Sequence, residues 1–134
     1  MKVAPLPDTP PVVAIVDDDQ AMREALFELL QVAGLSARTY QGANAFLVDY
    51  QPGVVDVLVT DVRMPGVDGL ELQERLHRLD PLLPIVFVTG SSDPATKRRA
   101  VAAGAYAYLS KPIGDVELMG TLWAALAGDP PAIT

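Results

Sequence analysis

The sequence contains no cysteine and no long apolar run, and both absences exclude whole classes of protein. Without cysteine the chain can form neither disulfide bonds nor thiolate metal sites. Half of the residues are hydrophobic, yet no apolar run approaches the roughly 18 to 20 residues that a membrane-spanning helix needs. The N-terminus also lacks the charged segment followed by an apolar stretch that is typical of a signal peptide. We therefore expect a cytoplasmic protein that does not enter a membrane.

Basic residues are scarce as well: 10 Lys and Arg stand against 17 Asp and Glu, which gives a net charge of −7. Direct binding of nucleic acid requires clustered Lys and Arg, so we do not expect it of this domain. The only histidine, His77, falls on the polar side of a predicted helix. That position favours a solvated side chain over a phosphohistidine relay.

The length of the chain indicates one compact domain, which we place at residues 12–127. Residues 1–11 contain four prolines and no periodic apolar residues, a composition typical of an extended, disordered tail. Residues 128–134, with Pro130 and Pro131, are interpreted in the same way.

Between the tails, five apolar runs alternate with helix-like segments. The runs, each expected to form a strand, cover residues 12–16, 35–40, 54–60, 84–89 and 105–109. This alternation predicts an α/β fold in which helices cover both faces of a parallel, doubly wound sheet.

Five helices are predicted from apolar spacing and end signals. The first carries an unbroken apolar stripe from Met22 to Ala33 and stops at Gly34, where a left-handed helix end suits glycine. Asp68 and Asp93 are expected to cap the third and fourth helices. The second, at 43–49, is short, and the fourth, at 94–103, has little apolar surface to bury. The apolar positions expected in the third and last helices are Leu72, Leu76 and Leu79, then Val116, Met119, Trp123 and Leu126.

Acidic residues follow two of the predicted strands. Asp17 and Asp18 come after residues 12–16, and Asp61 comes after residues 54–60. Because ligands of open α/β sheets bind at the carboxyl ends of the strands, we expect the three carboxylates to meet there. Carboxylates held close together repel unless a cation lies among them, and oxygen ligands suit Mg²⁺. Asp19 has a structural interpretation instead, as a helix N-cap.

Further polar groups follow the fourth and fifth strands, which end at Thr89 and near Lys111. Residues 90–92, Gly-Ser-Ser, offer reachable backbone N–H groups beside them. Each of these features alone is more often structural. Together, a carboxylate, a divalent cation, a hydroxyl and a lysine at one edge predict a site for a phosphoryl group.

The set Asp17-Asp18, Asp61, Thr89 and Lys111-Pro112 resembles the signature of the receiver domain of two-component response regulators. The resemblance covers roughly residues 12–127, and the intervals between these residues match that family. The runs Asp-Val-Arg-Met-Pro-Gly and Val-Thr-Gly are most similar to receivers of regulators with LuxR-type helix-turn-helix outputs. The resemblance implies a flavodoxin-like fold with strand order 2-1-3-4-5.

The resemblance also implies a role for each residue. Asp61 would accept a phosphoryl group from a phosphohistidine, and Lys111 would pair with Asp61 at rest. Mg²⁺, with Mn²⁺ as a possible substitute, would be held by Asp18 and Asp61, by Asp17 through water and by the backbone carbonyl of Arg63. Thr89 would bind the phosphoryl group, and Tyr108 would turn inward into the space that Thr89 leaves. These residues, named here as implied by the resemblance, are Asp17, Asp18, Asp61, Arg63, Thr89, Tyr108 and Lys111.

The function that follows is a signalling phosphoacceptor that catalyses only its own phosphorylation and dephosphorylation. Its expected partners are a sensor histidine kinase or phosphotransfer protein, a downstream output domain or protein, and, when phosphorylated, a second copy. The surface of the fourth helix, fifth strand and fifth helix is expected to switch, with Lys97, Arg98 and Arg99 either contacting partners or forming only a solvated face.

Two alternatives come from other functional classes. Asp17-Asp18-Asp19 could be the Asp-x-Asp opening of a haloacid-dehalogenase-type phosphatase. The chain could also be a receiver-like interaction module that works without phosphorylation. Incubation with acetyl phosphate and Mg²⁺ distinguishes the three, because only the receiver gives a stable adduct.

Overall fold

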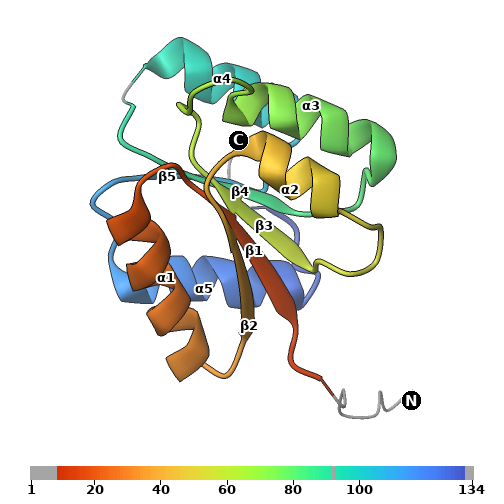
Figure 1. The fold of residues 1–134 in the computed structure, drawn as a ribbon. Helices are drawn as coiled ribbons and strands as arrows, with labels where there is room; N and C mark the ends of the chain where they lie inside the picture. The colour runs from red at the N-terminus through yellow and green to blue at the C-terminus, as the bar shows by residue number, and fades with distance from the viewer. Residues whose placement is uncertain (1–8, 92, 132–134) are drawn as a thin grey trace.

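The computed structural model describes residues 9–91 and 93–131. Within them a single parallel sheet has the strand order β2-β1-β3-β4-β5 (Figure 1). The strands are β1 (Val12–Val16), β2 (Ser36–Tyr40), β3 (Val57–Thr60), β4 (Ile85–Thr89) and β5 (Ala107–Ser110). The order reverses between β1 and β3, so the expected doubly wound α/β fold with five strands is confirmed.

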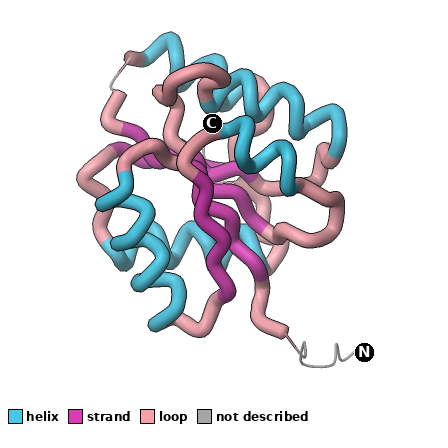
Figure 2. Tube along the Cα trace, in the orientation of Figure 1, coloured by secondary structure: helices cyan, strands magenta, loops and turns pink. Residues whose placement is uncertain are grey.

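Five helices connect the strands, and Figure 2 shows them on both sides of the sheet. They are α1 (Gln20–Val32), α2 (Ala43–Asp49), α3 (Gly69–Leu79), α4 (Pro94–Ala102) and α5 (Asp115–Leu126). In Figure 1, α1 and α5 lie on one face of the sheet, while α2, α3 and α4 lie on the other. The fold is therefore three layers, with the sheet in the middle.

Two apolar cores follow from the alternation of side chains along the strands. Val13 and Ile15 of β1 belong to the core beneath α1 and α5, together with Leu30 of α1. Ala14 and Val16, one position away in each case, belong to the opposite core with the helices α2, α3 and α4. The central strands β3 and β4 are buried along their whole length, as strands covered on both faces should be.

Three helices begin at a carboxylate and α1 ends at a glycine, as the sequence predicts. Asp19, Asp68 and Asp93 are the N-caps of α1, α3 and α4, and each accepts backbone N–H bonds. Gly34 follows α1 with φ +84°. Its N–H donates to Gln31 and the next N–H donates to Leu30 at 2.9 Å, a Schellman end that satisfies the last carbonyls of the helix.

The apolar face of α5 corrects our prediction. Val116 is 89% exposed and Trp123 is 46% exposed, whereas Leu118 and Leu122 are fully buried. Apolar residues occupy most of the circumference of this helix, so spacing alone does not select a face. In α3, Leu79 is also exposed, although we expected it to be buried. Gln73, a polar residue, is buried together with the leucines of that helix.

Four strands begin later than expected, β2 and β4 by one residue and β3 and β5 by more. Residues 54–56 precede β3. Asp56 is bonded to Val12 of β1 twice, because its backbone N–H donates to Val12 O and its Oδ2 accepts from Val12 N, both at 2.8 Å. Before β5 begins at Ala107, Ala105 N donates to Ala100 O at the end of α4, at 3.0 Å, and Tyr106 N makes the first backbone bond to β4, to Ile85 O at 2.8 Å.

Most of the expected N-terminal tail, residues 1–8, lies outside the described residues, as do 132–134. Pro11, the last residue of that tail, is tied to the sheet, because its carbonyl accepts from Ser36 N at 3.0 Å. None of the helices in the described part of the chain is long and apolar enough to span a membrane.

Candidate functional site

The register of the central strands places two acids side by side. Val16 at the end of β1 pairs with Thr60 at the end of β3, so Asp17 and Asp61 are the next residues on neighbouring strands. The backbone bonding continues past the strand ends, because Asp61 N donates to Val16 O at 3.1 Å and Asp17 N donates to Tyr40 O at 3.1 Å. Both carboxylates are therefore set on ordered backbone at the carboxyl edge of the sheet.

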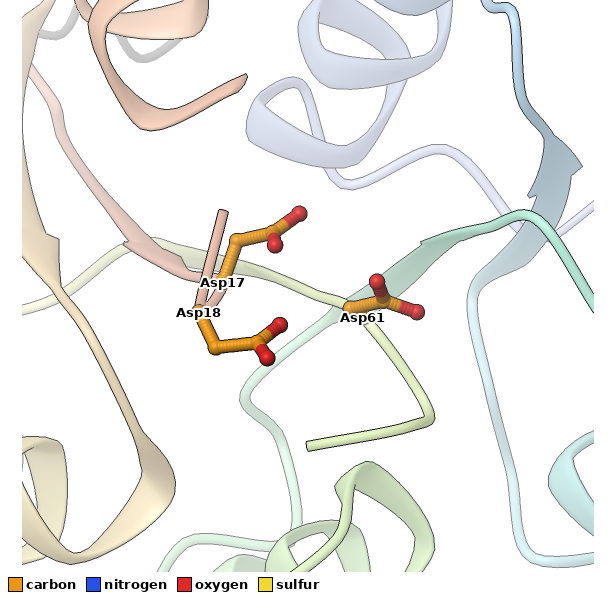
Figure 3. A group of neighbouring side chains, drawn as sticks. All are labelled: Asp17, Asp18 and Asp61. Atoms are coloured by element: carbon orange, nitrogen blue, oxygen red, sulfur yellow. The ribbon is translucent and has the colours of Figure 1, made fainter. Parts of the chain in front are cut away.

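Asp18 completes a group of three carboxylates, shown in Figure 3. One oxygen from each of Asp17, Asp18 and Asp61 lies within 4.8 Å of the other two. Asp17 is buried, Asp61 is half-buried and Asp18 is exposed. An all-oxygen set that is open on one side suits a hard cation such as Mg²⁺ or Mn²⁺, so these three residues fit the expected metal.

Lys111 reaches this group from the end of β5. Its Nζ donates to Asp61 Oδ2 at 2.9 Å and to Asp17 Oδ2 at 3.0 Å. Its backbone N–H donates to Thr89 O at 2.8 Å, and the bond to Pro112 is cis. The pairing with Asp61 is the one that the resemblance implied, while the bridge to Asp17 was not foreseen. Nothing in the sequence indicates that one ammonium would serve both acids.

The electrostatics of the site follow from this pairing. Burial raises the pKa of Asp17, and the charge of Asp61 adds to the rise, although hydrogen bonds from Asp19 N and Lys111 oppose it. Burial lowers the pKa of Lys111, but its bonds to Asp61 and Asp17 outweigh burial and the net shift of that pKa is upward. The lysine is thus held as the ammonium ion by the acids around it.

The two oxygens of Asp61 have different partners. Oδ1 accepts from Val62 N at 2.7 Å, with Arg63 N at 3.4 Å, while Oδ2 accepts from Lys111. The carboxylate therefore accepts hydrogen bonds from the backbone on one oxygen and from an ammonium group on the other. This arrangement fixes its rotation about the bond to Cβ.

Asp61 opens onto a depression of about 390 Å³. The depression is lined by Asp61, Arg63, Thr89, Gly90, Ser91 and Lys111. The Thr89 hydroxyl accepts from Ser91 N at 3.1 Å, which leaves its own hydrogen available to donate to a ligand. A hydroxyl, an ammonium and small residues around a carboxylate form a space in which a phosphoryl group could be bound.

Tyr108, the expected switch aromatic, is 8% exposed. Its ring lies 5.9 Å from that of Phe87, and its hydroxyl has no hydrogen-bond partner among the described residues. Burial raises its pKa, with a further rise from the charge of Asp93. The resemblance implied that the ring turns inward into the space that Thr89 leaves. In this structure the ring is already buried, and its response to a phosphoryl group stays a prediction.

One contact at the site escaped the sequence analysis. Arg23, in the first turns of α1, donates through Nη1 to the carbonyl of Asp17 at 2.7 Å. It steadies the backbone that carries two of the three acids. An arginine six residues after a strand-end acid is too common a pattern to indicate this on its own.

The family of the chain is decided by a match over residues 13–122 to the family model described as "Response regulator receiver domain". The chain belongs to the response regulator receiver family. It is 39% identical over 119 residues to response regulator protein TodT of Pseudomonas putida, which covers 89% of this chain and 52% of TodT. It is also 40% identical over 118 residues to the C4-dicarboxylate transport transcriptional regulatory protein DctD of Pseudomonas aeruginosa, covering 85% of this chain and 25% of DctD.

Among solved structures, response regulator StyR is similar, with 39% identity and a TM-score of 0.83 over 90% of this chain and 61% of that one. The receiver family favours the phosphoacceptor interpretation over the haloacid-dehalogenase-type phosphatase. The receiver spans about half the length of TodT and about a quarter of DctD. Because these relatives are regulators of different lengths, they do not single out the LuxR-type output, which remains a prediction.

Proposed function

We propose that Asp61 of this receiver accepts a phosphoryl group from the phosphohistidine of a sensor histidine kinase or phosphotransfer protein. The observation that carries the proposal is the double hold on the Asp61 carboxylate, by Val62 N on Oδ1 and by Lys111 on Oδ2, at the mouth of the depression. A carboxylate fixed in this way is aligned for attack, and positioning is the main requirement of phosphoryl transfer.

In the proposed reaction a carboxylate oxygen of Asp61 forms a bond to phosphorus as the phosphorus–nitrogen bond of the donor breaks. The imidazole leaves with the electron pair of that bond and takes up a proton. Lys111 exchanges its bond to Asp61 Oδ2 for one to a phosphoryl oxygen, and the Thr89 hydroxyl donates to another. The product is an acyl phosphate that adds charge and strong acceptors to the site.

For the cation, we propose direct bonds from Asp18 and Asp61, a water-mediated bond from Asp17 and a bond from the backbone carbonyl of Arg63. The indirect role of Asp17 agrees with its existing partners, because Oδ1 accepts from Asp19 N at 2.9 Å and Oδ2 accepts from Lys111. A bound Mg²⁺ or Mn²⁺ supplies positive charge that offsets the carboxylates and the transferring oxygens.

The proposed readout is the surface formed by α4, β5 and α5, in the cytoplasm. The loop from Thr89 leads into α4, so engagement of the hydroxyl by a phosphoryl group pulls on that helix. Lys97 and Arg98 would offer this surface a positive charge for an output domain, of LuxR-type or another kind, or for a second phosphorylated copy, unless they form only a solvated face. Arg99 instead lines depressions together with α3 residues such as Glu74 and Arg78. The domain acts on no substrate beyond its own acyl phosphate.

Replacement of the acceptor tests the proposal directly. The wild-type receiver, incubated with acetyl phosphate and Mg²⁺, should be labelled stoichiometrically, and hydroxylamine should remove the label because it cleaves acyl phosphates. Asp61→Asn should not be labelled, since an amide cannot act as the carboxylate nucleophile. Asp129→Asn, which changes an exposed acid after α5, is the matched control and should be labelled like the wild type. Intact-mass measurement and circular dichroism report labelling and folding.

Other outcomes have distinct meanings. Labelling of Asp61→Asn that maps to Asp18 would reject Asp61 as the acceptor. Release of free phosphate with no adduct would point to the phosphatase, and no reaction of any variant would point to the phosphorylation-independent module.

Hydrogen exchange tests where the switch acts. On phosphorylation, amides of residues 93–110 should change protection the most, because α4 buries only Thr96 and Ala100 and segments with few buried contacts open at low cost. Amides of α1 and α2 serve as the internal control. A change confined to α1 or α2 would place the switch on a different surface.

A further inference from the structure

Gly69, the first residue of α3, has no room for a side chain. A Cβ placed there would collide with the carbonyl oxygen of Asp61 and would lie 2.9 Å from Val62 Cα. No other glycine of the described residues has an atom within 4 Å of the corresponding point. Nor does Gly69 have a left-handed φ, unlike Gly66 at +78° in the same loop. Contact with the acceptor's backbone, and not local conformation, therefore requires glycine at this position.

The backbone that Gly69 touches carries the partners of the acceptor. Asp61 O belongs to the peptide group whose N–H is that of Val62. Val62 O, which accepts from Gly69 N at 2.7 Å, belongs to the next peptide group, whose N–H is that of Arg63. Those two N–H groups are the ones that face Asp61 Oδ1, at 2.7 Å and 3.4 Å. Gly69 thus contacts both peptide groups that orient the carboxylate.

We propose that Gly69 is a positioning residue for the phosphorylation of Asp61, a role that rests on the function proposed above. It lets the first turn of α3 press directly on the two peptide groups that hold Oδ1. A methyl group there must either push α3 away or tilt those groups, and tilting turns the N–H bonds away from Oδ1. The carbonyl of Arg63, proposed as a cation ligand, is next in the chain and moves with them.

Gly69→Ala is the test, with Gly120→Ala as the matched control. Gly120 is an exposed glycine within α5 with open space around it, and alanine in a helix is favoured over glycine. By helix propensity alone both variants should be more stable than the wild type. Instead, Gly69→Ala should have a lower thermal midpoint than the wild type, and Gly120→Ala a higher one.

The rate of labelling separates positioning from stability. At saturating acetyl phosphate and Mg²⁺, and corrected for the folded fraction, Gly69→Ala should be labelled roughly ten- to a hundredfold more slowly than the wild type, as expected for a misplaced reacting group. The acetyl phosphate concentration for half-maximal rate should stay the same, since Lys111 and Thr89 are untouched. Gly120→Ala should be labelled at the wild-type rate. A folded Gly69→Ala with the wild-type rate would overturn the proposal.

Amide resonances provide a readout that does not depend on phosphorylation. Val62 and Arg63 N–H signals should shift in Gly69→Ala and stay in place in Gly120→Ala. If the wild type is not labelled at all, the proposed function fails, while these two signals still decide whether Gly69 orients the peptide groups. Unchanged signals would reject that orientation.

Thr60→Val covers the case in which Gly69→Ala does not fold. The Thr60 hydroxyl donates to the same Asp61 carbonyl at 2.9 Å, and valine keeps the shape of this buried side chain. If the orientation of that peptide group governs the reaction, Thr60→Val should stay folded, shift the Val62 signal and slow labelling severalfold. Wild-type rate and signals in this variant would contradict the proposal.

Discussion

The helices α3 and α4 lie on the same face of the sheet, yet they are held to it very differently (Figure 1). α3 buries three leucines and Gln73, and its first residue presses on the backbone of Asp61. α4 buries only Thr96 and Ala100, and its exposed surface is rich in basic residues. Burial of large aliphatic side chains contributes about 1.5 to 3 kcal/mol each. The buried leucines therefore hold α3 firmly against the sheet, whereas α4 has no large aliphatic side chain that does the same.

This difference matters because each helix follows a loop that lines the depression. α3 follows the loop from Asp61, and α4 follows the loop from Thr89. A phosphoryl group on Asp61, as proposed above, would be attached to the firmly held side and would bond to the weakly held one. Asp61 would then stay in place while α4 responds, which is the property that a switch needs.

Leu76→Ala should loosen the attachment of α3 to the sheet and has the largest expected effect. Leu76 is fully buried in α3, so its truncation should lower the free energy of unfolding by roughly 2 to 5 kcal/mol through lost burial and a cavity. Leu79→Ala, in the same helix but 58% exposed, is the control and should change it by about 0.5 kcal/mol or less. Urea denaturation measures both. Equal effects would mean that α3 is not anchored through this face.

Gln73→Leu should loosen α4 further by removing a hydrogen bond that joins it to α3. Gln73 Nε2 donates to Ala100 O at 3.0 Å. That carbonyl keeps its bond from Ala105 N, so the loss should be only about 1 kcal/mol. Amide exchange near the end of α4, at Gly104 and Ala105, should become faster, while the amides of α3 keep their rates.

The control for this change is Gln31→Leu, on the exposed side of α1, which should leave α4 unaffected. Unchanged exchange at Gly104 and Ala105 in Gln73→Leu would show that α4 does not depend on α3 at this end.

The sequence predicted the ends of the helices and strands better than the contacts between these elements. Strand ends, N-cap acids and the glycine after α1 are local signals, because a strand-end acid or a cap depends only on nearby backbone. The face of α5 could not be predicted, since Leu118 and Val116 are equally apolar and only the sheet beneath decides which is buried. Likewise, nothing local indicates that Gln73 would be buried against Ala100.

The same limit applies to the site. Asp17, Asp18 and Asp61 could be expected at one edge of the sheet, because parallel strands end at the same edge. That β1 and β3 are neighbours followed only from the resemblance to the receiver family. Two hydrogen bonds could not be predicted in this way: the one from Lys111 to the Asp17 carboxylate and the one from Arg23 to the Asp17 carbonyl. Both depend on the positions that α1 and β5 take beside that edge in the folded protein. For Gly69 the sequence indicated only that it follows Asp68, the predicted N-cap of α3. Its contact with Asp61 arises from a close approach of two backbones, which no residue pattern encodes.

The cap of α4 gives the smallest predicted effect, and it depends on pH. Asp93 Oδ2 accepts from the Thr96 hydroxyl at 2.9 Å and Oδ1 accepts from Ala95 N at 3.1 Å. These bonds hold the pKa of Asp93 below its ordinary value of 3.8, with help from the charges of Arg63 and Arg98. Because the folded pKa is lowered, the stabilisation is present above the unfolded pKa and is lost as the pH falls through the folded pKa.

Asp93→Asn should therefore lower the thermal midpoint slightly at neutral pH, and the difference from the wild type should shrink in acid as Asp93 takes up its proton. Thr96→Val is the matched variant, because it removes the largest cause of the shift and keeps the shape of a buried side chain. It should bring the pKa of Asp93 back toward 3.8 and flatten the pH dependence. Thermal melts at a series of pH values, together with the carboxyl titration followed by NMR, measure both changes. If the wild type and Asp93→Asn stay equally far apart down to the most acidic buffer, the charge of Asp93 does not hold the start of α4, and the weak attachment of that helix has another origin.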